Sequence, residues 1–378
     1  MSELDRTTLV IGAGASVDFG FPTGNDLIQT ISWLADSIGK DGNTSIVPGD
    51  YILGEVRRAA RQRFGKLIGN DYRSNATRVR DGLWLSASID NYLNEQRDDQ
   101  VADLGKFLIV AAILLHERYR FPPEGQQTSE LFRRPNLLWK ALCSPHASSR
   151  GGFSQLRSSW LVPFFRILRG QCSLEEFGKR LDKLTLIIFN YDRSVEFFLH
   201  QAIMTYDQMD ANDASELLSR IQIIHPYETA ARLPFQNDGL GVPYGGVDES
   251  SFLDLLLDAP LIQTFAEPNA GQGRADAQQA IRISKNLVFM GFGFLEQNLM
   301  YLGKDEDMGV APNLQRQVFC TTYGLSDYQR DRNLNRIKSF QWADTRDELR
   351  GSRTEVSRIH HLNATSSELI SEFGHEWF

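Results

Sequence analysis

Short apolar segments that are rich in β-branched residues recur along the chain and predict buried strands. The predicted strands are 8–11, 184–189, 221–224, 287–290 and 317–321. Four of these segments end in a glycine or a polar cluster and are followed by apolar residues at helical spacing. A repeated order of strand, turn and helix predicts an α/β fold with a Rossmann-like parallel sheet and helices on both faces.

The long interval between the first two predicted strands has a mostly helical pattern of apolar positions. Ser88 is a candidate N-cap, and the apolar run from Val101 to Tyr119 predicts a long buried helix. We therefore expect a mostly helical insertion after the first βα unit. The expected units are a core of 1–30 and 180–345, the insertion of 31–179, and a C-terminal extension of 346–378 that is a candidate assembly element.

The composition is that of a folded protein, with 42% hydrophobic and 23% charged residues among 378. No apolar run is long enough to span a membrane, and the first residues lack a targeting pattern, so we expect a cytoplasmic protein. The net charge of −8 argues against nonspecific nucleic-acid binding by the whole chain, and direct sequence-specific nucleic-acid binding is not expected either. Cys143, Cys172 and Cys320 lie too far apart in the sequence for a cysteine zinc site, so no metal is predicted.

The residues after the first predicted strand suggest a nucleotide-binding loop. Gly12 and Gly14 permit a tight turn and a close approach of the backbone to a ligand, and the small residues Ala13, Ala15 and Ser16 would not block it. The pattern is not GxGxxG, and no Walker lysine follows. A tight turn without a ligand therefore remains the alternative. For Ser16 and for Asp18 we expect helix capping.

Three other predicted strands also end in residues that could carry chemistry. Asn190 and Asp192 follow the second, His225 follows the third, and Gly291 and Gly293 follow the fourth. Asn190 and Asp192 could cap a helix or hold a ribose hydroxyl or a water molecule. His225 could transfer a proton or simply bond to a neighbour. Because ligands bind beyond the carboxyl ends of parallel strands, these residues are expected to converge on one site.

In this order and spacing the residues resemble the sirtuin-like family of NAD-consuming domains. The resemblance rests on Gly12-Ala13-Gly14-Ala15-Ser16, Gly20-Phe21-Pro22, Asn190 with Asp192, His225, and Gly291-Phe292-Gly293. The chain lacks the four-cysteine module of deacylating sirtuins, and Pro226 stands where those proteins have a glycine. The insertion and the segments SIDNYL, FNYDRSVE and FMGFGF are more similar to bacterial sirtuin-like proteins of antiphage defence, which hydrolyse NAD⁺.

This resemblance implies that NAD⁺ is the substrate and that ADP-ribose and nicotinamide are the products. The loop from Gly12 to Ser16, with Pro22, would hold the pyrophosphate, and Gly291, Phe292 and Gly293 would lie on the adenosine side. Asn190 would orient the ribose or the attacking water, Asp192 would fix the nicotinamide end, and His225 would polarise a ribose hydroxyl or accept a proton.

The resemblance also implies homo-oligomers and a partner such as a HerA-type ATPase, with NAD⁺ depletion as the means of defence. Three alternatives stay open at this point. The domain could sense NAD⁺ or ADP-ribose without cleaving it, it could be a scaffold subunit of a defence complex, or it could be a deacylase.

Overall fold

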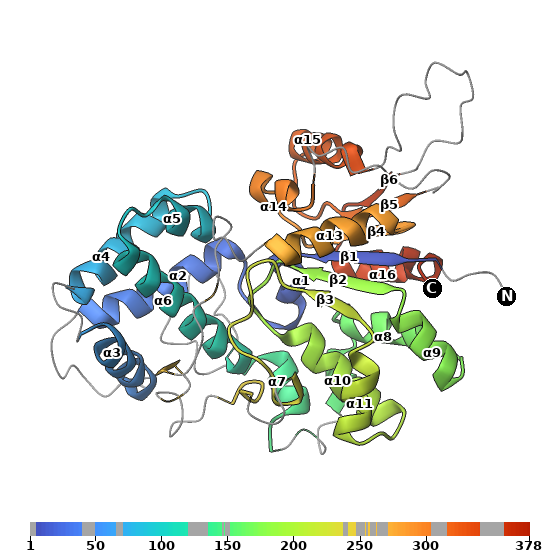
Figure 1. Cartoon of the computed structure of the whole chain (residues 1–378), viewed down its shortest axis with the longest axis horizontal. Helices are drawn as coiled ribbons and strands as arrows, with labels where there is room; N and C mark the ends of the chain where they lie inside the picture. Colours follow the sequence, from blue (N-terminus) through green and yellow to red (C-terminus); the bar gives the residue numbers. More distant parts are fainter. Residues whose placement is uncertain are drawn as a thin grey trace.

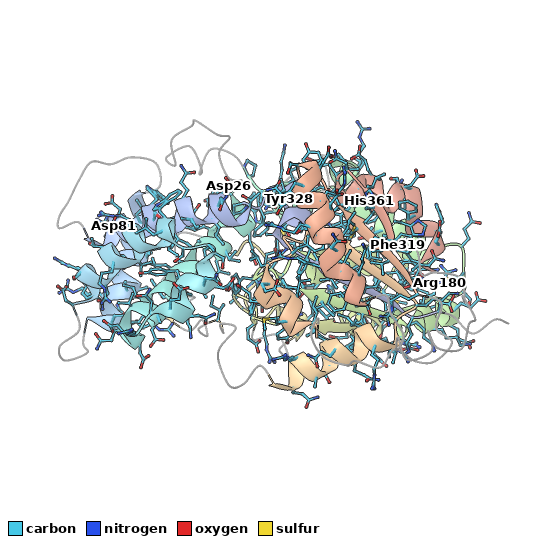
Figure 2. All side chains as sticks on the ribbon, turned by 90° about the horizontal axis from the view of Figure 1, so that it is seen from above. Asp26, Asp81, Arg180, Phe319, Tyr328 and His361 are labelled. Atoms are coloured by element: carbon cyan, nitrogen blue, oxygen red, sulfur yellow. The ribbon has the colours of Figure 1, made fainter. Side chains whose placement is uncertain are left out.

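The chain folds into a core built on one β-sheet and a lobe of helices that extends from one side of this core (Figure 1). Asp81 lies in the helical lobe, Asp26 lies near the start of α2 (Gly24–Gly39), and Arg180 lies toward the opposite end of the core (Figure 2). The computed structural model describes residues 5–39, 50–65, 71–119, 135–145, 147, 152–236, 241–246, 254, 256–257, 262, 271–303, 316–340 and 359–378.

The sheet contains six strands, all parallel, in the order β3-β2-β1-β4-β5-β6. They are β1 (Thr7–Ile11), β2 (Leu184–Ile188), β3 (Gln222–Ile224), β4 (Asn286–Met290), β5 (Gln317–Thr321) and β6 (Ile359–Leu362). The five strands predicted from the sequence are all present, with ends that differ by at most one residue. The strand order reverses at β1, which lies between β2 and β4, as it does in Rossmann-like folds.

Helices cover both faces of the sheet, as predicted. The core helices are α8 (Leu161–Arg169), α9 (Leu174–Leu181), α10 (Ser194–Tyr206), α11 (Ala211–Leu218), α13 (Gly271–Ile283), α14 (Glu296–Tyr301), α15 (Asp327–Ile337) and α16 (Ser366–Phe373). On one face α8 contacts α10 and α16, while α13 lies on the other (Figure 1). Capping boxes at Ser173, Ser326 and Thr365 satisfy backbone donors where α9, α15 and α16 begin.

The interval between β1 and β2 is mostly helical, as expected. After α1 (Ala13–Ser16) and α2 it contains α3 (Asp50–Phe64), α4 (Tyr72–Gly82), α5 (Ile89–Glu95), α6 (Asp99–Arg118) and α7 (Leu137–Leu142), before α8 and α9. In the lobe α2, α4 and α6 pack against one another. The predicted cap is confirmed, because Ser88 Oγ accepts a hydrogen bond from Asn91 N at 3.1 Å. The chain turns before α6, and Asp98 caps this second helix.

A buried ion pair joins the insertion to the core. Glu117, near the end of α6, and Arg193, at the start of α10, are both fully buried, and Oε2 lies 2.6 Å from Nη2. Arg193 also donates to the carbonyl oxygens of Arg232 and Val242, at 3.1 and 2.8 Å. The backbone N–H of Gly245 donates to Glu117 Oε2 at 3.0 Å. The ion pair therefore also orders the chain that follows β3.

Residues 359–378 pack with the sheet core. β6 extends the sheet beyond β5, and it was not predicted from the sequence, because IHHL is a short, half-polar segment. Trp377 is 1% exposed, and its carbonyl oxygen accepts a hydrogen bond of 2.7 Å from Thr7 Oγ1. The aromatic C-terminal end thus packs inside the core, whereas 346–358 of the expected extension lie outside the described residues.

Asp18 lies in a single 3₁₀ turn (Val17–Phe19) next to the start of α8. Burial raises its pKa from 3.8 to about 6, against the opposing effect of a hydrogen bond from the backbone of Trp160. Oδ2 of Asp18 is buried without a hydrogen-bond partner among the described residues. The carboxylate therefore accepts a hydrogen bond at the start of α8 and does not cap the helix that follows it in the sequence. Because burial disfavours its charged form, ionisation of Asp18 destabilises the fold.

Replacement of Asp18 by asparagine is expected to change how stability depends on pH. The folded-state pKa lies above the unfolded value of 3.8, so the native protein binds the proton more tightly, and stability falls as the pH rises from about 4 to about 6. Asp18→Asn removes this contribution. The difference in unfolding free energy between variant and wild type, measured by urea titration, should rise across this window and then level off. A difference that is constant with pH would contradict the assignment.

Among the described residues, no helix combines the length and the apolar character needed to cross a bilayer.

Candidate functional site

A cavity of about 360 Å³ lies at the carboxyl edge of the sheet, where the strand order reverses. This volume is within the range of small-molecule sites. The ends of β1, β2 and β4, the chain after β3, and the insertion all contribute to its wall. Of the residues predicted from the sequence, the cavity is lined by Gly12, Ala13, Gly14, Ser16, Pro22, Asn190, Asp192, Gly291, Phe292 and Gly293.

The glycines of the two loops allow these loops to pack directly against each other. A Cβ on Gly12 would lie 2.6 Å from the carbonyl oxygen of Gly291. Gly291 has φ +55, and a Cβ there would lie 2.0 Å from the backbone nitrogen of Ala15. The close approach of backbone expected at Gly12 and Gly14 therefore occurs, but between two strands' ends.

This packing engages backbone N–H groups that were expected, from the sequence, to face an anion. Gly12 N donates to Met290 O, Gly14 N to Gly291 O and Ala15 N to Gly12 O, each at 3.0 Å. Ala15 is also fully buried and does not line the cavity. The N–H groups of Gly12, Gly14 and Ala15 therefore already have protein acceptors, and the expected phosphate-binding role of this loop stays a prediction. Gly293, by contrast, lines the cavity, and a Cβ on it would meet open space.

Asn190, Ser16 and Asp192 form one hydrogen-bonded network along the cavity. Asn190 Nδ2 donates to Ser16 Oγ at 2.9 Å and to Gly12 O at 3.2 Å, and Ser16 Oγ donates to Asp192 Oδ2 at 2.9 Å. Ser16 thus links two strand ends and does not cap a helix. Asp192 Oδ1 accepts from Ser194 N at 3.1 Å, which is the capping role considered for it. Burial raises the pKa of Asp192, although its hydrogen bonds from Ser194 and Ser16 act in the opposite direction.

His225 follows β3 as predicted, but it does not line the cavity. Its Nε2 lies 2.6 Å from Glu196 Oε1, and its Nδ1 lies 3.3 Å from the carbonyl oxygen of Asn190. Burial lowers the pKa of His225, but the charge and hydrogen bond of Glu196 and the Asn190 carbonyl together raise it above its ordinary value. Both ring nitrogens thus face protein acceptors. His225 thereby positions the backbone of Asn190, and its predicted role in proton transfer stays a prediction.

Several cavity residues were not predicted as site residues from the sequence. Asp90, on α5, accepts a hydrogen bond from the hydroxyl of Tyr191, the residue after Asn190. Burial raises the pKa of Asp90, against the opposing effect of this hydrogen bond. Tyr227 donates to Asn298 Oδ1 at 2.5 Å, and both line the cavity. In the sequence, Asp90 has the features of an ordinary acidic residue in the first turn of a helix. The one indication that it could belong to the site was its place in the SIDNYL segment.

The cavity wall includes aromatic side chains, and its charged residues are acidic. The ring centroid of Phe189 lies 5.8 Å from that of Tyr227 and 5.2 Å from that of Phe292. Asp90 and Asp192 are the charged residues among the described side chains that line the cavity, and no lysine or arginine is among them. Such a wall favours a ligand group that is flat, partly apolar and positively charged.

The insertion closes one side of the cavity. Ala87 to Asp90, at the start of α5, and Ile113, on α6, belong to the wall. Gln297 Nε2, on α14 of the core, donates to Ser88 Oγ at 3.4 Å. The insertion is therefore part of the site itself.

Within the described ranges no three His, Cys, Asp or Glu side chains are grouped so that they could hold a metal ion. No protein-family model matches the sequence, and no curated protein matches it.

Proposed function

We propose that the protein hydrolyses NAD⁺ to ADP-ribose and nicotinamide. The observation that carries the proposal is that Asn190, Ser16 and Asp192 form one network on a cavity at the point where the strand order reverses. In Rossmann-like sheets this is the place where dinucleotides bind. The resemblance of the same residues to sirtuin-like domains adds the reaction type.

The chemistry of the wall supports binding of the nicotinamide end of NAD⁺. The pyridinium ring is flat and positively charged, and the cavity combines Phe189, Phe292 and Tyr227 with the carboxylates of Asp90 and Asp192. Because no basic side chain is among the described wall residues, the pyrophosphate would lie toward the mouth of the cavity, near Gly293. There the backbone has open space beside it.

The reaction requires little acid catalysis, because nicotinamide leaves as a neutral molecule from a cationic precursor. Cleavage leaves positive charge on the ribose, which a fixed carboxylate stabilises. Asp192 would supply this charge, and Asn190 would orient the attacking water or a ribose hydroxyl through Oδ1, which has no protein partner among the described residues. His225 and Glu196 would hold Asn190 in place from behind.

Incubation of the purified protein with NAD⁺, followed by chromatography of the products, tests the proposal. We expect equimolar nicotinamide and ADP-ribose. NADH is the control, because its neutral dihydronicotinamide is a poor leaving group and should not be released. The incubation is repeated with the partner protein encoded alongside, since the resemblance implies a restrained enzyme. NAD⁺ that stays intact in both incubations would overturn the proposal.

A second candidate function is binding of NAD⁺ or ADP-ribose without cleavage. It is favoured by one observation, namely that His225 contacts Glu196 and does not line the cavity. A sensor of this kind would show saturable binding by calorimetry with no product in the same sample, whereas a hydrolase would deplete the ligand during the titration.

We further propose that this activity serves antiphage defence by depletion of NAD⁺, in homo-oligomers and with a partner such as a HerA-type ATPase. This part rests on the resemblance alone. Size measurement in solution, with and without that partner, tests it.

A further inference from the structure

Asp90 belongs to the cavity wall but does not come from the sheet. It lies on α5 of the insertion, whereas Asn190 and Asp192 come from the end of β2. The hydroxyl of Tyr191 donates to Asp90 Oδ1 and so ties α5 to the strand end that carries Asn190. The cavity is thus lined by two carboxylates that are delivered by different parts of the fold.

The two carboxylates differ in how fully their oxygens are engaged. Asp192 accepts from the Ser16 hydroxyl on Oδ2 and from the Ser194 backbone N–H on Oδ1, and the Ser194 side chain is a third donor to this carboxylate. Among the described side chains Asp90 has only the Tyr191 hydroxyl as a donor, together with its own backbone N–H. A carboxylate has about four acceptor positions. Asp90 therefore retains more capacity to accept a proton from a ligand or a water molecule.

We infer that Asp90 is the catalytic base of the site and that the insertion is required for catalysis because it supplies this residue. The inference rests on the proposed function. It assigns the proton transfer to Asp90, which lines the cavity, whereas His225 contacts Glu196 and is not among the cavity-lining residues. Burial of the carboxylate makes it a stronger base than an exposed aspartate, which suits proton transfer near neutral pH.

The step balances without any other reactant. The oxygen of water forms a bond to C1′ of the nicotinamide ribose, and the bond from C1′ to the ring nitrogen breaks. The electron pair of that bond neutralises the pyridinium, so nicotinamide leaves uncharged. The proton of the water passes to Asp90 and from there to solvent.

Substitution of Asp90 by asparagine tests the inference, because asparagine keeps an acceptor for Tyr191. We expect kcat for nicotinamide release to fall about 100-fold or more, with KM changed little. The acid limb of the pH profile of kcat/KM should disappear, since that limb reports the protonation of the base. Asp99→Asn, an exposed aspartate in the first turn of α6, is the matched control and should behave as wild type.

Tyr191→Phe separates a catalytic role from a structural one. The titratable groups around Asp90 are Tyr191, which hydrogen-bonds to it, Tyr227, which senses its charge, and Asp192 on the same cavity. The Tyr191 hydrogen bond lowers the pKa of Asp90. Its loss should therefore move the acid limb to higher pH while activity above that limb persists. If the hydrogen bond between Tyr191 and Asp90 had only a structural role, its loss would leave the acid limb of the pH profile at the same pH.

Each outcome decides between the two proposals. If the wild type releases nicotinamide and Asp90→Asn does so equally well, the role of Asp90 is overturned and the proposed function stands. If Asp90→Asn is inactive but the limb does not move in Tyr191→Phe, Asp90 is not the base. If the wild type with its partner leaves NAD⁺ intact, the proposed function fails, and the role of Asp90 fails with it.

Discussion

Replacing Asn190 by alanine is expected to lower the rate of nicotinamide release by about 100-fold to 1000-fold, the usual effect of losing one positioned polar group at a reacting centre. The side chain lines the cavity, and its Nδ2 is held by Gly12 O and Ser16 Oγ, so that Oδ1 keeps a fixed direction. Alanine removes both the group that would orient water and the link between the two strand ends.

The measurement is single-turnover release of nicotinamide together with NAD⁺ affinity. Asn212→Ala, at an exposed position in α11, is the matched control. Because Asn190→Ala also removes two buried hydrogen bonds, we expect a stability loss of about 1–3 kcal/mol, which thermal unfolding will show. Full activity of a folded Asn190→Ala protein would rule out the role given to this residue, whatever the fate of the proposal for Asp90.

Glu117→Ala is expected to lower the free energy of unfolding by about 3–5 kcal/mol, the effect typical of removing one partner of a buried ion pair. Arg193 would be left charged and fully buried, and the N–H of Gly245 would lose its acceptor. The pair joins α6 to the start of α10, just after Asp192. We therefore expect Glu117→Ala to loosen the contact between the insertion and the site as well as to destabilise the fold.

Urea titration of the free energy of unfolding measures this effect. Glu175→Ala, which breaks the exposed pair with Lys179, is the control and should have a much smaller effect, because solvent screens an exposed pair. The double variant Glu117→Leu, Arg193→Met should recover part of the loss because it leaves no unpaired charge. Recovery should be incomplete, since the carbonyl groups of Arg232 and Val242 also lose their donor. Equal effects of Glu117→Ala and Glu175→Ala would contradict this account.

The strands could be predicted because strands of a parallel sheet are buried on both faces and consist of near-continuous apolar residues. β1, β2 and β4 are of this kind and are buried along their whole length. β6 escaped prediction because it lies at the edge of the sheet and carries His360 and His361, so that it shows neither a continuous run nor a strict alternation.

The candidate site was predictable in part. Asn190, Asp192 and Gly291 were identified because they directly follow apolar strands, and strand ends of a parallel sheet meet at one edge. The direction of a side chain cannot be read in the same way. His225 stands at such a strand end, yet it turns to Glu196, a residue on α10 that no spacing rule connects with it.

Local sequence alone therefore determined the Rossmann-like sheet, the helical insertion and the group of strand ends, since burial of apolar strands and the geometry of parallel connections leave few other arrangements. Only the tertiary structure decided which loop amides were already used by the contact between Gly14 and Gly291, that His225 is paired with Glu196, and that Asp90 comes to the cavity from the insertion. These are contacts between residues far apart in the chain. They depend on how whole elements pack, and no pattern along the sequence encodes them.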